Sequence, residues 1–152
     1  MTTYATEPRL GTDPASLYVE VQQFYARQVR LLDDLRAEEF AATFTEDGVF
    51  APSPGIPPAH GREAIAAALR AGHARRFGTE PVRCRHWHNM LRVDPGPDGA
   101  LLTHYYTLMM VSRPWDPAPL IAPSSVVEDV LVYEDGELVT RERRVIPDHQ
   151  SF

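Results

Sequence analysis

The pattern of apolar and polar positions changes its period near the middle of the chain. From Pro14 onward, apolar residues recur at three- and four-residue spacing, which predicts an amphipathic helix with Asp13 as its cap. Beyond Pro81, apolar and polar residues instead alternate as they do in β-strands. The predicted elements are helices over 14–34, 38–44 and 61–76 and strands over 49–51, 83–93, 100–112, 123–133 and 138–146.

This order of elements predicts the fold class. Helices followed by long antiparallel strands form an α+β domain, in which a cone-shaped, curved antiparallel sheet wraps around N-terminal helices. We expect residues 1–13 to be a flexible N-terminal arm and residues 14–152 to form a single domain. Segment 52–60 contains four prolines and is expected to be a loop. A small ligand would bind between the concave side of the sheet and the first helices.

Composition and charge narrow the range of partners. The chain has 152 residues and a formal net charge of −6, and its 15 Lys and Arg residues are scattered, so no basic stripe is available for nucleic acid. No apolar stretch approaches the length of a membrane span, and we expect a cytoplasmic protein with no membrane partner. The single cysteine, Cys84, excludes an internal disulfide and is expected to be a small core residue.

Two predicted strands, 85–91 and 101–108, each place imidazole among large apolar side chains. Because strand side chains alternate, His86 and His88 share one face of the first strand. If the two strands pair across the turn between them, His86 and His104 are expected to face a common cavity. Histidine in an apolar pocket is suited to moving protons near neutral pH. These segments therefore indicate acid–base chemistry.

Several segments carry a family resemblance. Residues 31–34 at the end of the first helix, together with the following segment 40–50, resemble the nuclear-transport-factor-2-like superfamily and its SnoaL-like branch. Within that branch, segments 85–91 and 127–132 look like the small accessory proteins of actinomycete aromatic polyketide pathways, of the actinorhodin type. The resemblance covers most of the chain and implies the same curved-sheet fold.

The resemblance also implies a set of site residues. The branch includes scytalone dehydratase, whose site combines two strand histidines, an aspartate at the end of the first helix, and tyrosine and serine hydroxyls. By sequence order it implies that His86, His104 and Asp34 are catalytic, with Asp33 as a register alternative to Asp34. Polyketide cyclases of the branch instead rely on one aspartate, which leaves Asp34 and Asp129 as alternatives. The residues expected to contact substrate are Tyr25, Trp87, His88, Tyr106, Ser125 and Asp129.

The expected function is a cofactor-independent enzyme of aromatic polyketide biosynthesis. It would act on a hydroxy-ketone as a dehydratase or as a dehydrative or aldol cyclase, through an enol. The sequence contains no phosphate loop or dinucleotide fingerprint, so we expect no nucleotide or flavin. Two alternatives are a non-catalytic binding or assembly subunit of a polyketide or oxygenase pathway, and a hydrolase or cyclase that opens an epoxide.

Three further expectations concern metal, charge and assembly. A metal held by His86, His88 and His104 is disfavoured, because no acidic residue lies beside them in the sequence. Asp129 lies in an apolar strand, so if it faces inward it must be hydrogen-bonded or protonated. Glu128 would then lie on the outer side of the sheet, which we expect to pair with a second copy in a homodimer.

Overall fold

The first helix begins where the sequence provides a cap. In the computed structural model, which describes residues 13–150, the Ser16 backbone N–H donates to Asp13 Oδ1 at 2.9 Å. Pro14 occupies the first turn, where its missing N–H is not needed. The predicted helix and its cap are confirmed. Residues 1–12 of the expected N-terminal arm lie outside the described residues.

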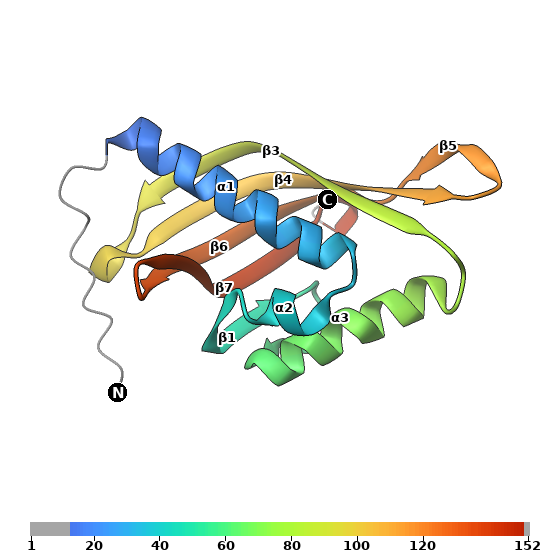
Figure 1. Ribbon diagram of the computed structural model, residues 1–152, viewed down its shortest axis with the longest axis horizontal. Coiled ribbons are helices and arrows are strands. Elements are labelled where there is room, and N and C mark those ends of the chain that lie inside the picture. The colour runs from blue at the N-terminus through green and yellow to red at the C-terminus, as the bar shows by residue number, and fades with distance from the viewer. Residues whose placement is uncertain (1–12, 151–152) are drawn as a thin grey trace.

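The elements follow one another as the sequence pattern predicts, with two additions (Figure 1). The helices are α1 (Pro14–Asp33), α2 (Ala37–Ala41) and α3 (Arg62–Phe77). The strands are β1 (Phe44–Ala51), β2 (Ala59–His60), β3 (Arg83–Pro95), β4 (Leu101–Arg113), β5 (Asp116–Ile121), β6 (Ser125–Glu134) and β7 (Glu137–Pro147). Short 3₁₀ turns are η1 (Pro97–Gly99) and η2 (Asp148–Gln150).

The additions are β2, at the end of the segment expected to be a loop, and β5, between two of the predicted strands. Ala59 and His60 pair with β1, so the end of the proline-rich segment does join the sheet. The β5 strand includes Pro117 and Pro119 and, among the described strands, pairs with the end of β4 alone. Proline is tolerated there because an edge strand leaves one row of backbone groups without a partner strand. In Figure 1 this hairpin extends beyond the body of the domain.

The strands form one curved, open sheet in the order β2-β1-β7-β6-β4-β3. Strands β3, β4, β6 and β7 are antiparallel as predicted, whereas β1 runs parallel to β7 and makes the sheet mixed. Helix α1 lies across one face of this sheet (Figure 1). We call that face the inner face and the opposite one the outer face. The predicted α+β class with a curved sheet around N-terminal helices is confirmed.

The main core lies between α1 and the inner face, where it joins Val21, Phe24 and Tyr25 to Leu101, Tyr105, Val127, Leu131 and Leu138. A second cluster, which includes Phe40, Phe44 and Ile65, joins α2 and α3 to β1. Cys84 packs with Met109 and Val111, as expected for a small core residue. None of the described helices is long and apolar enough to cross a membrane.

A β-bulge in β3 decides which side chains face α1. Asn89 pairs with Tyr106, but the next pair joins Arg92 to His104, so β3 carries one extra residue there. Met90, inside the bulge, has a left-handed φ of 57°. Such an insertion reverses the alternation of side chains along the strand. On the C-terminal side of the bulge the odd-numbered residues face inward, and on the N-terminal side the even-numbered residues do.

Candidate functional site

A histidine and an aspartate meet where the end of α1 crosses β3. The Nδ1 atom of His86 lies 2.6 Å from Asp33 Oδ1, and the Asp33 carboxylate also accepts the His86 backbone N–H at 3.1 and 3.2 Å. Because a carboxylate only accepts, Nδ1 carries a proton and Nε2 is left for another partner. Only 5% of the Asp33 side chain is exposed, compared with 21% of the His86 side chain. The pair is built to hold one imidazole in one orientation.

Asp34 is not the aspartate that meets His86, which corrects one expectation. Its side chain is exposed and its backbone caps the end of α1. The reason is helix geometry: at about 100° per residue, Asp33 lies roughly 80° around α1 from the buried Tyr25, whereas Asp34 lies roughly 180° away. The register alternative, Asp33, is therefore the residue that the fold brings to the histidine.

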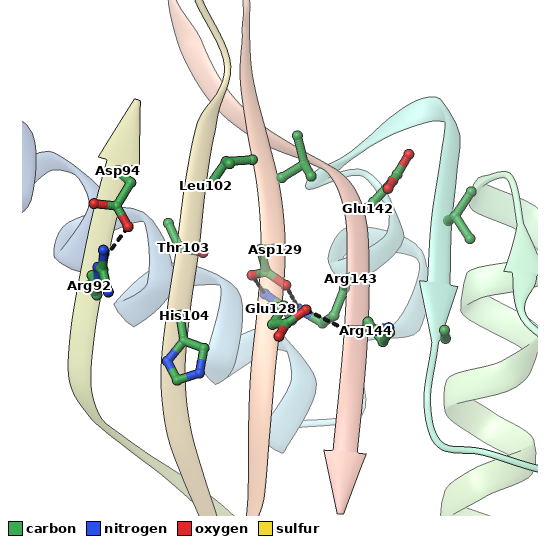
Figure 2. A pocket seen from close by; sticks show the side chains of 13 residues that line it. Arg92, Asp94, Leu102, Thr103, His104, Glu128, Asp129, Glu142, Arg143 and Arg144 are labelled. Carbon is green, nitrogen blue, oxygen red and sulfur yellow. Dashed lines mark hydrogen bonds and ion pairs between the residues drawn. The ribbon is translucent and has the colours of Figure 1, made fainter. Parts of the chain in front are cut away.

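His104 does not share a cavity with His86, which corrects a second expectation. It pairs with Arg92 beyond the bulge and lies on the outer face, whereas His86 pairs with the buried Met109. His104 lines an open depression of about 670 Å³ on that face (Figure 2). The depression also contains two ion pairs, Arg92 to Asp94 and Arg144 to Glu128. His86, His88 and His104 therefore cannot bind a common metal ion.

Trp87 and Tyr106, both expected to contact substrate, also lie on the outer face. Trp87 alternates with His86 and His88, and its side chain is 62% exposed. Tyr106 pairs with Asn89 and is 53% exposed. Neither side chain can reach a ligand bound between α1 and the sheet, because the backbone of the sheet separates them from it.

Asp129 faces inward and is fully hydrogen-bonded, as expected for a carboxylate in an apolar strand. Its Oδ2 accepts from the Tyr25 hydroxyl at 2.7 Å and from the Tyr105 hydroxyl at 3.3 Å. Thr103 lies 2.5 Å from the Tyr25 oxygen and must be the donor there, because Tyr25 gives its single proton to Asp129. Arg143 donates to both carboxylate oxygens, at 2.9 and 2.7 Å.

Arg143 reaches this carboxylate because of a second bulge. Val130 pairs with Glu142 and Leu131 with Thr140, which leaves Arg141 as the extra residue and turns Arg143 inward. Its guanidinium also donates to Gln28 Oε1 at 2.6 Å. Gln28 in turn donates to the hydroxyls of Thr43 and Thr140 at 2.8 and 3.0 Å. The buried charges are thus paired with each other and tied to α1.

The charges of this network keep its groups in defined protonation states. Burial alone would lower the pKa of the Arg143 guanidinium, but the Asp129 carboxylate outweighs it and raises that pKa further. Burial, and then the negative charge of Asp129, raises the pKa of Tyr25 well above its ordinary value. Burial does the same for Tyr105. Both phenols therefore stay protonated and act as hydrogen-bond donors.

His88 lies on the inner face beside these phenols. Its ring is 4.7 Å from the Tyr105 ring and 6.1 Å from the Tyr25 ring, between centroids. Burial, followed by the positive charge of Arg143, lowers the pKa of His88 from 6.5 to about 3. The His88 imidazole is consequently neutral throughout the physiological range. On the neighbouring strands, Thr107 and Ser125 continue the same row of inner-face positions.

The depressed pKa of His88 predicts a specific loss of stability in acid. Below about pH 6.5 the unfolded chain binds a proton at His88 that the folded protein binds only near pH 3, so the free energy of unfolding falls as the pH falls. The residue contributes a slope of at most about 1.4 kcal/mol per pH unit. We expect His88→Gln to be less stable at neutral pH but to have a shallower slope between pH 6 and 4 in urea titrations. An unchanged slope would show that His88 titrates normally.

Sequence reasoning missed part of this site. Thr107 was seen only as a strand position, and Gln28 only as one member of the helix repeat. The one available signal was that Gln28, a polar residue, occupies an apolar position of that repeat, which indicates a buried hydrogen-bond partner. Thr107 gives no comparable signal, because threonine is common on both faces of strands.

The family of the chain follows from comparison with known domains. A family model described as a SnoaL-like domain matches residues 13–144, and the chain belongs to that family. The fold, with N-terminal helices on a curved sheet, agrees with this membership. A search of curated proteins found no match.

Solved structures extend the comparison. ActVI-ORFA from Streptomyces coelicolor is 41% identical, with a TM-score of 0.81 over 88% of this chain and 98% of that one. A protein from Catenulispora acidiphila, solved in complex with S-DNPA, is 44% identical, with a TM-score of 0.81 over 90% of this chain and 97% of that one. A putative scytalone dehydratase from Novosphingobium aromaticivorans is 19% identical, with a TM-score of 0.71 over 88% and 85%, and shares the fold.

Proposed function

We propose that this protein is a cofactor-independent acid–base enzyme of aromatic polyketide biosynthesis. It removes water from a hydroxy-ketone, or closes a ring on one by dehydrative or aldol chemistry. The observation that carries the proposal is the pairing of His86 with Asp33 on the inner face. Membership of the SnoaL-like family and the S-DNPA complex of the Catenulispora relative favour a small aromatic substrate.

In the proposed dehydration, Nε2 of His86 removes a proton from the carbon next to the ketone. The electron pair of that C–H bond moves onto the carbonyl oxygen and forms an enolate. His88, which is neutral, donates its ring N–H to this oxygen. The His86 imidazolium, stabilised by Asp33, then returns the proton to the β-hydroxyl group, which leaves as water while the enolate collapses to an enone. His86 ends the reaction neutral, as it began.

The remaining inner-face residues have supporting roles in this proposal. Tyr25 and Ser125 line the binding site together with His88. Asp129 acts indirectly, because its side chain has no exposed surface and both of its oxygens accept from the protein. It is a positioning residue that holds the phenols of Tyr25 and Tyr105 behind the substrate.

Neighbouring aspartates offer a matched test of this function. We expect Asp33→Asn to lower the turnover of 3-hydroxy-1-tetralone, a bicyclic β-hydroxy ketone, by at least about tenfold, because the His86 ring loses the group that sets its tautomer. Loss of water converts this compound to 1-naphthol, which fluorescence detects. Asp34→Asn removes the same charge one residue later, on the exposed side of α1, and should leave turnover unchanged.

The same assay separates the alternatives. Equal rates for the two aspartate variants would contradict the role of the Asp33 and His86 pair. If the unaltered protein binds the hydroxy-ketone without converting it, the protein is a binding subunit. If it neither binds nor converts that ketone but hydrolyses the corresponding bicyclic epoxide, the epoxide-opening function holds instead.

We also propose that the outer face forms a homodimer interface. This face exposes the large side chains of Trp87, Leu102 and Tyr106 beside charges of both signs, so it can complement a second copy of itself. Light scattering should give twice the monomer mass, and Tyr106→Glu should shift it toward the monomer. Tyr18→Glu, which places the same charge on the exposed side of α1, should leave the dimer intact. A monomer in the unaltered protein would contradict the proposal.

A further inference from the structure

One buried hydroxyl on the inner face has no protein partner. The oxygen of Thr107 is inaccessible to solvent and makes no hydrogen bond with the residues that the structure describes. Leaving such a group unsatisfied costs about 1–3 kcal/mol. The other inner-face threonine of β4 near the site, Thr103, has a partner in Tyr25. The side chain of Thr107 is therefore placed for a partner from outside the protein.

The neighbours of Thr107 indicate what that partner is. Thr107 lies directly between His88 on β3 and Ser125 on β6, and paired residues of adjacent strands point to the same face. The three side chains form a row of groups that can donate hydrogen bonds but carry no net charge while His88 is neutral. Such a row suits the oxygen of a ketone or a phenol. It offers no fixed positive charge of its own to a carboxylate or a phosphate.

The row lies close to His86, the proposed base. His86 is two residues before His88 on the same strand, so the two inward positions are about 7 Å apart along β3. A hydrogen bond from the row to a ketone oxygen, together with the reach of His86 Nε2 to the carbon next to that ketone, spans such a separation. One ligand can therefore contact the row and His86 at the same time.

We propose that Thr107, together with His88 and Ser125, binds the ketone or phenol oxygen of an aromatic ligand and so selects the substrate of this site. The proposal rests on the proposed function for the role of His86 and for the aromatic class of the ligand, and it adds the oxygen site. Thr107 is a binding residue in this arrangement, and its hydroxyl donates to the ligand oxygen.

The test compares two valine variants that each remove a buried, unpartnered hydroxyl. Thr107→Val should bind 1-tetralone, a bicyclic ketone, about fivefold to tenfold more weakly than the unaltered protein, which is the worth of one hydrogen bond. Its affinity for tetralin, the same bicycle without oxygen, should not change. Thr107→Ser keeps the hydroxyl and should keep the preference for the ketone. Ligand-detected NMR titration measures both affinities without any turnover.

Thr45→Val is the matched control. Thr45 is the other buried hydroxyl without a partner among the described residues, and it lies on β1, which β7 separates from the strands of the row. Both valine variants should be at least as stable to urea as the unaltered protein, because a methyl group replaces an unsatisfied hydroxyl. Only Thr107→Val should lose affinity for 1-tetralone.

The outcomes separate this inference from the proposed function. If Thr107→Val is less stable and binds 1-tetralone normally, its hydroxyl has an internal role and the oxygen site is wrong. If Thr107→Val loses the ketone preference while Asp33→Asn retains full turnover, the oxygen site holds and the proposed acid–base mechanism fails. Equal binding of 1-tetralone and tetralin by the unaltered protein would also overturn the oxygen site.

Discussion

His86→Ala is expected to lower the turnover of the bicyclic hydroxy-ketone by about a hundredfold or more, the usual contribution of a positioned acid or base. The expectation follows from the contact of His86 Nδ1 with Asp33, which leaves Nε2 available to the substrate. Folding should be little affected, because part of the imidazole is exposed and the backbone N–H of residue 86 still donates to the Asp33 carboxylate. Steady-state kinetics on the purified variant, with circular dichroism as the test of folding, measures the effect.

His104→Ala is the matched control for this experiment. It removes an imidazole from the adjacent strand, but from the outer face, so turnover should stay within about twofold of the unaltered protein. A comparable loss in both variants would mean that the outer face takes part in catalysis. Retention of full activity in His86→Ala would remove the histidine from the reaction.

Arg143→Met should destabilise the protein by about 3–5 kcal/mol, because it leaves the Asp129 carboxylate buried without its countercharge. The pair is inaccessible, with 5% of the arginine side chain and none of the aspartate side chain exposed. Urea unfolding followed by tryptophan fluorescence gives the free energy. Asp129→Asn combined with Arg143→Met should recover part of the loss, since no unpaired charge then remains.

Arg144→Met provides the comparison at the next residue. Arg144 pairs with Glu128 on the outer face, where 64% and 43% of the two side chains are exposed. Exposed ion pairs contribute at most about 1 kcal/mol, so the free energy of unfolding should hardly change. Similar losses for the two arginine variants would contradict the view that burial, and not pairing alone, sets the value of the inner pair.

The amino-acid sequence by itself determined the elements and their order. The helical spacing from Pro14 and the alternation beyond Pro81 are local properties, because they depend on how one segment divides its apolar and polar residues between two sides. That an inward Asp129 must be hydrogen-bonded or protonated also followed locally, since a carboxylate in an apolar strand needs a partner or a proton. The partner itself did not follow, because Arg143 turns inward only through the bulge at Arg141.

The site was decided by tertiary structure. Strand alternation correctly grouped His86 with His88, but it placed His104 with them because it assumed an uninterrupted β3. The single extra residue at Met90 reverses the alternation, so that His86 faces α1 while His104 faces away. Likewise, the sequence does not distinguish Asp33 from Asp34 as the partner of a histidine. The rotation of α1 about its axis on the sheet brings Asp33 to His86. Bulges and helix rotation depend on contacts between distant segments, so no local pattern reports them.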